Sequence, residues 1–269
     1  MDLEQIKKHV FVSCPFDLLK QKYLPVIIHQ CINPEVGLNG TILDTYRLKD
    51  FLDVSKALHT NGLSCTVHAP FTDISCGAVD AKIRAISLER LKYAVDLAAL
   101  FQARSLVFHT GWERKIYAEA TEMWLGFAIE TISHLCEHAK ASGVKVALEN
   151  VFEPDTELHK RIFYAVSEEQ LGFCLDAGHV YAFSKTPLNR WVEDLGPRIT
   201  HLHLHDNNGK SDEHLAPGKG IVDFDLIFSW LAGHDMRPVL TLEAHDEETV
   251  IPGLMAIGEF MAKYFAIEE

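Results

Sequence analysis

The chain has 269 residues, of which 48% are hydrophobic, 10% aromatic and 23% charged, and its formal net charge at pH 7 is −13. This composition is typical of a globular protein with a large core, and the length suits a closed α/β barrel that forms one unit. The excess of acidic residues argues against sequence-independent binding of nucleic acid, which needs a basic surface. No uncharged apolar run is long enough to span a bilayer.

Eight short β-like runs recur along the chain, and most are followed by a helical pattern. The expected strands cover residues 10–13, 33–38, 64–68, 105–109, 144–149, 171–176, 199–204 and 239–243. The second strand has the weakest pattern, because Pro34 must lie at its start. The most regular helical patterns cover residues 79–101, 122–141 and 248–265. The segment 16–30 contains Pro25 and is expected to be half helix and half loop.

The repeated order of a strand and then a helix predicts a (β/α)8 TIM barrel, in a single domain over residues 1–269. A doubly wound open sheet is the alternative. Its dinucleotide-binding form has no support, because no G-x-G-x-x-G motif follows the first strand.

The cysteines are scattered and form no C-x-x-C pair, and the N-terminus shows no secretory signal pattern. We therefore expect six reduced thiols in a cytoplasmic protein.

The stretch 201–220 concentrates side chains that bind metals. Three histidines alternate with two leucines over residues 201–205, so a strand would place all three imidazoles on one face. The stretch then becomes a polar loop that carries Asp212 and His214. Imidazole nitrogen and carboxylate oxygen are ligands of divalent metals. Taken alone, the stretch fits a solvated His-rich loop equally well.

Side chains of this kind also stand at or just past the carboxyl ends of six consecutive expected strands. They are His68, His109, Glu149, Asp176, His203 and Glu243. In a barrel these ends meet at one mouth, where active sites form. Glu149 and Glu243 each end an apolar strand, where an unpaired carboxylate would carry a heavy desolvation cost. No Arg or Lys is near either in sequence, so a divalent metal is the simplest partner.

Asp176 is followed by an imidazole, His179, one turn further on, and Gly178 would let the backbone turn tightly between them. The alternative is an aspartate that caps the next helix beside a surface histidine.

These residues resemble the xylose isomerase-like TIM barrels. That family includes sugar and sugar-phosphate isomerases and epimerases, and also the endonuclease IV type of abasic-site nucleases (AP endonuclease family 2). The resemblance covers essentially the whole chain. It is carried by the runs VHAPF (67–71), VFHTG (107–111), ALEN (147–150), LDAGH (175–179), HLHD (203–206), DEH (212–214), GKGIVDF (218–224) and LE (242–243). The family pattern selects His203, rather than His201 or His205, as the ligand from the seventh strand.

The isomerase and epimerase branch implies one divalent ion held by Glu149, Asp176, His203 and Glu243. Manganese or zinc is expected, with cobalt and magnesium as alternatives. The resemblance further implies a metal-stabilised cis-enediolate, with Glu149 and Glu243 as the acid and base, and a sugar or sugar-phosphate substrate. His179 would then contact the substrate. The resemblance implies no particular oligomeric state.

The nuclease branch uses three zinc ions and nine ligands to hydrolyse abasic-site DNA. This chain has a matching residue at all nine positions, since His68, His109, His179, Asp212 and His214 add to the four metal ligands named above. In the isomerase reading these five are additional metal or substrate contacts.

Three features favour the isomerase branch over the nuclease. The run after the third strand, residues 68–73, differs from the Ser-Tyr-Leu type of wedge that those nucleases insert into DNA. The loops after the first three strands hold almost no Arg, the nearest being Arg47. Residues 206–209 and 218–224 also look like the sugar branch. We therefore expect a small-molecule substrate, with nucleic acid as the disfavoured alternative partner. A non-catalytic metal- or sugar-binding barrel is disfavoured, because both proton-transfer glutamates are in place.

Overall fold

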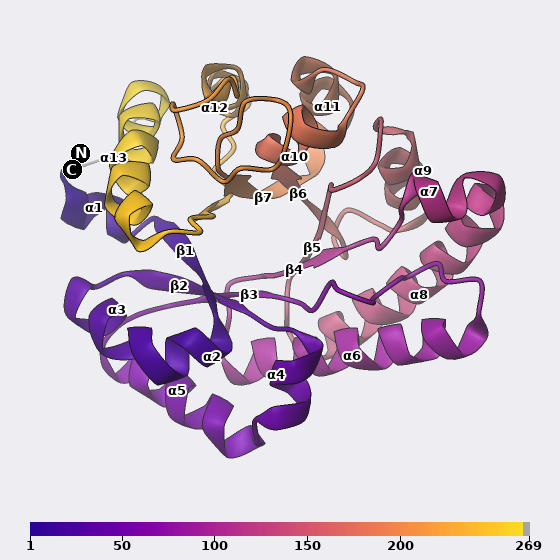
Figure 1. The fold of residues 1–269 in the computed structure, drawn as a ribbon, viewed down its shortest axis with the longest axis horizontal. Coiled ribbons are helices and arrows are strands. Elements are labelled where there is room, and N and C mark those ends of the chain that lie inside the picture. Colours follow the sequence, from indigo (N-terminus) through magenta and orange to yellow (C-terminus); the bar gives the residue numbers. More distant parts are fainter. Residues whose placement is uncertain (266–269) are drawn as a thin grey trace.

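Eight parallel strands close into a barrel in a computed structural model that describes residues 1–265 (Figure 1). Each strand pairs with the next along the chain, and the eighth pairs with the first. The strands are β1 (Val10–Pro15), β2 (Asn33–Gly37), β3 (Thr66–His68), β4 (Leu106–His109), β5 (Val146–Glu149), β6 (Gly172–Asp176), β7 (Ile199–Leu204) and β8 (Val239–Leu242). The expected (β/α)8 barrel is confirmed, and the open sheet is wrong.

Helices surround the barrel, and the first and last of them, α1 and α13, pack against each other (Figure 1). The α-helices are α1 (Leu3–Lys7), α2 (Phe16–Leu18), α3 (Leu24–Gln30), α4 (Gly40–Thr45), α5 (Leu48–Thr60), α6 (Ala81–Leu100), α7 (Arg114–Tyr117), α8 (Thr121–Ala141), α9 (Glu157–Ala165), α10 (Ala177–Phe183), α11 (Leu188–Leu195), α12 (Phe224–Gly233) and α13 (Glu247–Tyr264). Short π and 3-10 turns extend them at η1 (Leu19–Tyr23), η2 (Ala118–Ala120) and η3 (Gly196–Arg198). Among the residues described, no helix is long and apolar enough to cross a membrane.

The segment 16–30 differs from the prediction, because it is helical throughout. It consists of α2, the π turn η1 and α3. Pro25 lies in the first turn of α3, at its junction with the π turn η1, where the hydrogen-bond pattern of the helix changes. The proline therefore starts a helical segment here and does not end one. The three long helices predicted from periodicity are present, with ends shifted by three residues or fewer.

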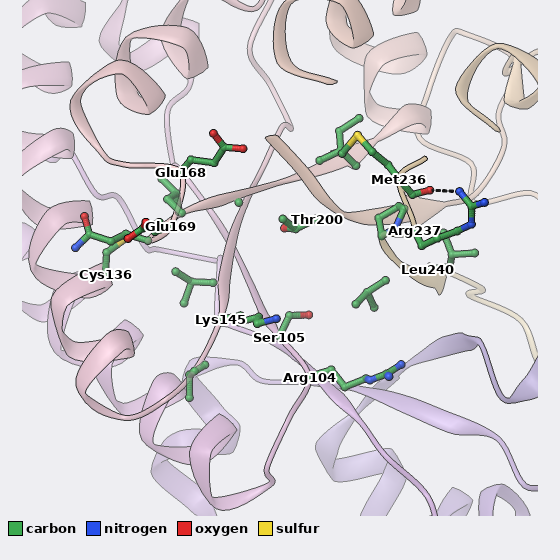
Figure 2. A pocket seen from close by; sticks show the side chains of 18 of the residues that line it. Arg104, Ser105, Cys136, Lys145, Glu168, Glu169, Thr200, Met236, Arg237 and Leu240 are labelled. Carbon is green, nitrogen blue, oxygen red and sulfur yellow. Dashed lines mark hydrogen bonds between the residues drawn. The ribbon is translucent and has the colours of Figure 1, made fainter. Parts of the chain in front are cut away.

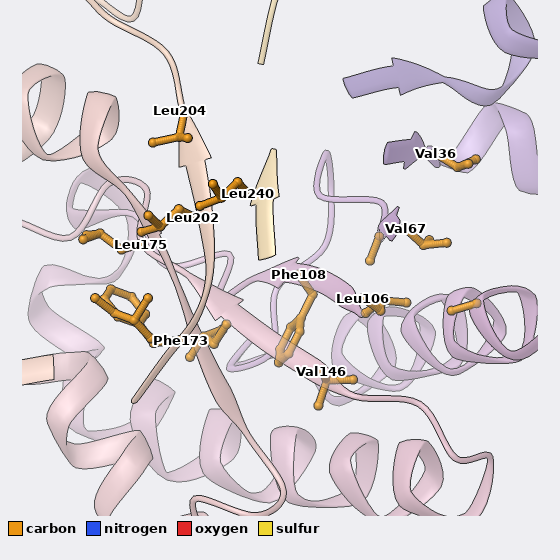
Figure 3. Close-up of a cluster of buried hydrophobic side chains, with 14 of the residues drawn as sticks. Val36, Val67, Leu106, Phe108, Val146, Phe173, Leu175, Leu202, Leu204 and Leu240 are labelled. Carbon is orange, nitrogen blue, oxygen red and sulfur yellow. The ribbon is translucent and has the colours of Figure 1, made fainter. Parts of the chain in front are cut away.

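Successive side chains along each strand point alternately outward, towards the helices, and inward, into the barrel. Outward-facing side chains such as Leu106 and Phe108 are fully buried under the helices and belong to the main hydrophobic core (Figure 3). Inward-facing Val107, Ala147 and Cys174 form a small separate cluster inside the barrel. Every second residue of a strand faces inward, so the side chains two residues further on also face into the barrel. These are the last residues of β4, β5 and β6, namely His109, Glu149 and Asp176, and they meet at the mouth.

The cysteines carry no disulfide within residues 1–265, and five of the six are buried. Burial raises the pKa of the thiols of Cys65 and Cys76 to about 12, so these are unreactive core residues.

Candidate active site

All nine of the ligand-type residues named from the sequence lie together at the mouth of the barrel, in one network of short contacts. Six come from the ends of strands β3 to β8, one from α10 and two from the loop after β7. They are His68, His109, Glu149, Asp176, His179, His203, Asp212, His214 and Glu243.

The centre of the network is the imidazole of His203. Its Nδ1 atom lies 3.0 Å from Oε1 of Glu243, 3.3 Å from Oε2 of Glu149 and 4.0 Å from Oδ2 of Asp176. Two ligands bound at about 2.05 Å in a tetrahedral site lie about 3.3 Å apart, so the separations of His203 from Glu243 and Glu149 match the spacing of donors around one ion. Asp176 lies further from this nitrogen, at the edge of the same group.

Two further imidazoles approach Glu149 from β3 and β4. Nε2 of His68 and Nε2 of His109 lie 3.2 Å and 3.1 Å from its Oε2 atom. The other ring nitrogen of His68 is fixed by the carbonyl oxygen of Ala69 at 2.8 Å. A single carboxylate oxygen is thus approached by two imidazoles.

The far side of the network contains the loop residues Asp212 and His214. Oδ2 of Asp212 lies 3.0 Å from Nε2 of His214 and 3.3 Å from Nε2 of His179. His205 also belongs to this group, because its Nε2 atom lies 3.0 Å from Oδ2 of Asp176. The family pattern passes over His205, and the alternation along β7 was the signal that could have retained it.

Asp206 holds the loop after β7 in place and is itself fully buried. Its carboxylate accepts backbone N–H bonds from Gly218, Gly220 and Val222 at 2.8 to 3.0 Å. Its own backbone exchanges two hydrogen bonds with Leu215. These contacts fold residues 206–222 back over the barrel, which brings Asp212 and His214 to the mouth.

Asn150 joins the ends of β5 and β6. Its side chain donates to the carbonyl oxygen of Asp176 at 2.8 Å and accepts from the N–H of Asp176 at 2.9 Å. Its own carbonyl oxygen lies 2.9 Å from Nδ1 of His179. Asp176 in turn caps α10, because its Oδ1 atom accepts the N–H of His179 at 2.7 Å. The capping interpretation of Asp176 is right, but His179 is buried and not a surface residue.

Gly178 has a different role from the one expected. It lies inside α10 and makes no tight turn. A Cβ atom at this position would lie 2.1 Å from Cε1 of His205. Glycine is required here because the imidazole of His205 packs directly against the helix backbone.

Buried charges of opposite sign govern the electrostatics of the mouth. Burial alone would raise the pKa of Glu149, but the imidazoles of His203 and His109 hold it well below its usual range. The pKa of Glu243 is lowered in the same way, mainly by His203. Burial would lower the pKa of His203, yet Cys174, Glu243 and Glu149 raise it well above the usual value. The salt-bridge partners of both glutamates in the described chain are imidazoles only.

Several buried nitrogen and oxygen atoms at the mouth have no hydrogen-bond partner within the described chain. They include both ring nitrogens of His203, Nδ1 of His205 and Oδ1 of Asp212. Buried polar atoms are rarely left unpaired, because each costs about 1–3 kcal/mol. Imidazole nitrogen and carboxylate oxygen atoms that lie close together without forming hydrogen bonds are the kind of ligand set that a divalent cation takes. The residues therefore fit the metal that the sequence implied.

Two residues at the site were not singled out from the sequence. Glu35, on β2, is fully buried and lies directly behind His203, with its Oε1 atom 3.1 Å from Nε2 of that residue. The sequence pattern of the second strand is weak, so Glu35 was not recognised, although an acidic residue in the middle of an expected barrel strand was a signal that could have found it. Phe71 is 51% exposed and stacks on His109 with ring centroids 4.8 Å apart. It offers an apolar face beside the imidazoles.

A cavity of about 860 Å3 lies at the opposite end of the barrel (Figure 2). It is lined by residues around the starts of strands β4 to β8, including Arg104, Lys145 and Arg237, and by none of the nine residues at the mouth. Donor chemistry, and not cavity size, therefore locates the candidate site.

A family model described as the xylose isomerase-like TIM barrel matches residues 35–262. The chain belongs to this family. Among its relatives, an uncharacterised protein of Methanocaldococcus jannaschii is 26% identical over 204 residues, which are 72% of this chain and 69% of that protein. Fructoselysine 3-epimerase of Escherichia coli O157:H7 is 28% identical over 150 residues, or 52% of each chain. A probable endonuclease 4 of Mycobacterium leprae is 25% identical over 197 residues, 67% of this chain and 72% of that protein.

Solved structures of the same fold cover nearly the whole chain. A D-tagatose 3-epimerase-like protein superposes with a TM-score of 0.83 at 22% identity, over 95% of this chain and 98% of that one. A protein of Thermus thermophilus, solved after soaking with ZnCl2, gives a TM-score of 0.79 at 27% identity, over 97% of this chain and 100% of that one.

Proposed function

We propose that the protein is a divalent-metal-dependent isomerase or epimerase of a sugar or sugar phosphate. The observation that carries the proposal is the placement of two carboxylates, Glu149 and Glu243, within 3.3 Å of one imidazole nitrogen of His203. They come from β5 and from the end of β8, so they approach the centre from different strands. Two carboxylates on either side of a substrate suit a reaction in which one removes a proton and the other returns it.

Glu149, Asp176, His203 and Glu243 would hold the ion. The mixture of imidazole and carboxylate donors suits manganese, zinc or cobalt better than magnesium, which prefers oxygen ligands. When bound, the ion supplies positive charge that stabilises the negative oxygen developing on the substrate. The spacing of the donors and the unpaired atoms at the mouth support this assignment.

The chain's own residues supply the proton transfers. One of Glu149 and Glu243 removes the proton from the carbon next to the substrate carbonyl, and the electrons pass to the carbonyl oxygen as a cis-enediolate forms. The other returns a proton. Return to the neighbouring carbon, with the hydroxyl proton passing from one oxygen of the enediolate to the other, interconverts aldose and ketose. Return to the opposite face of the same carbon gives an epimer. His179 and His68 lie within hydrogen-bond distance of Glu149 and face the same space, so they would contact substrate hydroxyl groups.

Phe71 would bind the apolar face of the substrate. Its exposed ring stacks on His109 at the edge of the network, where the C–H groups of a sugar can pack against it. The relative named fructoselysine 3-epimerase makes 3-epimerisation of a ketose the first reaction to test.

A screen of ketoses and ketose phosphates with Mn²⁺, Co²⁺ and Zn²⁺ tests the proposal. Metal-dependent conversion of at least one of them is expected. A protein that binds metal but converts none of these compounds would instead support the non-catalytic binding barrel.

A metal-dependent phosphodiesterase is the second candidate, and one observation favours it. Asp212 and His214 complete a network of nine ligand-type residues, as a three-zinc centre requires. A match to a probable endonuclease 4 points the same way. The net charge of −13 opposes it, since binding to a phosphate backbone is driven by cationic side chains. Cleavage of abasic-site DNA at low enzyme concentration would establish this alternative.

A further inference from the structure

A fully buried carboxylate lies inside the barrel, one layer below the candidate metal centre. Glu35 stands in the middle of β2 and is 0% exposed. Its Oε2 atom accepts hydrogen bonds from the hydroxyl groups of Thr66 at 2.8 Å and Thr241 at 3.1 Å. Its Oε1 atom has no hydrogen-bond partner within the described chain. Oε2 is therefore fixed by two hydroxyl groups, and Oε1 is still available to accept a hydrogen bond.

The free oxygen faces His203. Oε1 of Glu35 lies 3.1 Å from Nε2 of His203, at hydrogen-bond distance, but the ring is not aligned for a bond. The other imidazole near Glu35 already has two partners. His201 is hydrogen-bonded through Nδ1 to the Ser105 hydroxyl at 3.0 Å and through Nε2 to Thr241 at 2.8 Å. His203 is therefore the imidazole left to bond Oε1.

The opposite nitrogen of His203, Nδ1, faces Glu149 and Glu243 at the mouth. The ring thus spans two layers, with one nitrogen towards the ion site and one towards Glu35. Two other imidazoles at the mouth are oriented differently. Nδ1 of His68 lies 2.8 Å from the carbonyl oxygen of Ala69, and Nδ1 of His179 lies 2.9 Å from that of Asn150. Those hydrogen-bond partners are backbone carbonyls, although Nδ1 of His179 also lies 3.2 Å from Oε1 of Glu149. The group behind His203 is a carboxylate.

We propose that Glu35 is a positioning residue for the metal centre, whose Oε1 accepts the Nε2–H of His203 and so fixes the tautomer that presents Nδ1 to the ion. The inference rests on the proposed function, because it assumes a metal held by His203. A carboxylate behind a ligating imidazole fixes the ring and makes its free nitrogen a stronger donor. The arrangement also gives the buried anion a partner with positive character, which an isolated buried carboxylate would lack.

Titration of the metal-free protein with Co²⁺, followed by its visible absorption bands, tests the inference without any substrate. Glu35→Gln keeps the size of the side chain and removes its charge. We expect it to weaken Co²⁺ binding about 10- to 100-fold. Glu153→Gln is the matched control, because Glu153 is an equally buried carboxylate that bonds to Thr110 and Val151 and not to His203. Its Co²⁺ affinity should stay within about twofold of wild type.

A double-mutant cycle separates positioning from a general structural effect. If Glu35 acts through His203, adding Glu35→Gln to His203→Ala should change Co²⁺ affinity by less than about threefold. Additive losses would contradict the inference. Equal affinity of Glu35→Gln and wild type would also contradict it, while leaving the proposed function intact. A wild-type protein that binds no Co²⁺ would contradict both.

The tautomer can also be read in the wild-type protein, which keeps the test decisive if Glu35→Gln fails to fold. In ¹⁵N NMR spectra of the Zn²⁺-loaded chain, His203 should carry its proton on Nε2, and the shift of Nδ1 should show bound metal. A proton on Nδ1 with the metal on Nε2 would overturn the inference.

Discussion

Nδ1 of His203 lies 3.0 Å from Oε1 of Glu243, although β7 supplies the histidine and the residue just after β8 supplies the glutamate. The register of the two strands sets this contact, because His203 pairs with Thr241 and the side chain two residues later faces the same interior. The same imidazole nitrogen is approached by Glu149 from β5. One histidine therefore fixes the relative position of two carboxylates that are far apart in sequence.

Replacing either carboxylate with its amide should remove catalysis and leave the fold intact. Glu149→Gln and Glu243→Gln are each expected to lower kcat by about 10²- to 10⁴-fold, the usual contribution of a general acid or base. Both replacements keep the size of the side chain, so circular dichroism of the variants should show the wild-type fold, although loss of the buried charge should lower their Tm. Glu248→Gln, an exposed change on α13, is the control and should leave kcat unchanged. Near-normal turnover in either variant would refute the two-glutamate mechanism.

The number of metal ions per chain should distinguish the two candidate functions. We expect one tightly bound ion in the purified protein, measured by elemental analysis, if the isomerase assignment is right. In that case Asp212→Asn and His214→Ala should leave the stoichiometry at one. Three zinc ions in the wild type, falling to two or fewer in these variants, would support the phosphodiesterase.

The metal-free and metal-loaded proteins should respond to pH in opposite directions near neutrality. The pKa of His203 and that of His179 are raised above 6.5, so their stabilising effect is complete below about pH 6.5 and is lost as the pH rises. The pKa values of Glu149 and Glu243 are lowered below 4.5, so their effect is present above about pH 4.5 and is lost on acidification. The network should therefore stabilise the metal-free protein most between these limits.

Metal binding needs unprotonated imidazoles, so metal affinity should increase as the pH rises through the raised pKa values. Melting curves of the two forms across the neutral range test this. The gain in Tm on metal loading should grow with pH, and a gain independent of pH would contradict the prediction. Binding should also release protons, which calorimetry in buffers of different ionisation enthalpy can measure.

Gly178→Ala should destabilise the protein, although alanine normally stabilises a helix by about 1 kcal/mol relative to glycine. The added Cβ would lie 2.1 Å from the ring of His205, so the imidazole or α10 must shift. Gly126→Ala in α8 is the matched control, since a Cβ at that position meets nothing within 4 Å. Chemical denaturation should show a loss of about 1–3 kcal/mol for the first variant and a small gain for the second. Equal effects would show that His205 does not constrain Gly178.

The barrel could be predicted from the sequence because its signals are local. Each strand is a short apolar run, and the residue at its end is a polar side chain that stands out from that run. The prediction for residues 16–30 was wrong because Pro25 has two local meanings, helix breaker and first-turn residue, and only the packing of α3 decides between them.

Other parts of the site depend on contacts between distant residues. The orientation of Asp212 and His214 depends on Asp206, whose carboxylate binds backbone N–H groups up to 16 residues later in the chain. The role of Glu35 can be recognised only from the structure, in which the side chains of Glu35 on β2 and His203 on β7 both point into the barrel and lie in contact. The sequence pattern names the donors at the mouth, but it contains no information on which carboxylate orients which imidazole.

Solvent exchange tests the central claim most directly. The metal-loaded protein, incubated in D2O with a ketose or ketose phosphate that it converts, should introduce deuterium at the carbon next to the carbonyl. Glu149→Gln and Glu243→Gln should abolish turnover of that compound. Conversion without any deuterium at that carbon, or metal-dependent cleavage of abasic-site DNA with no exchange into any ketose, would contradict the account.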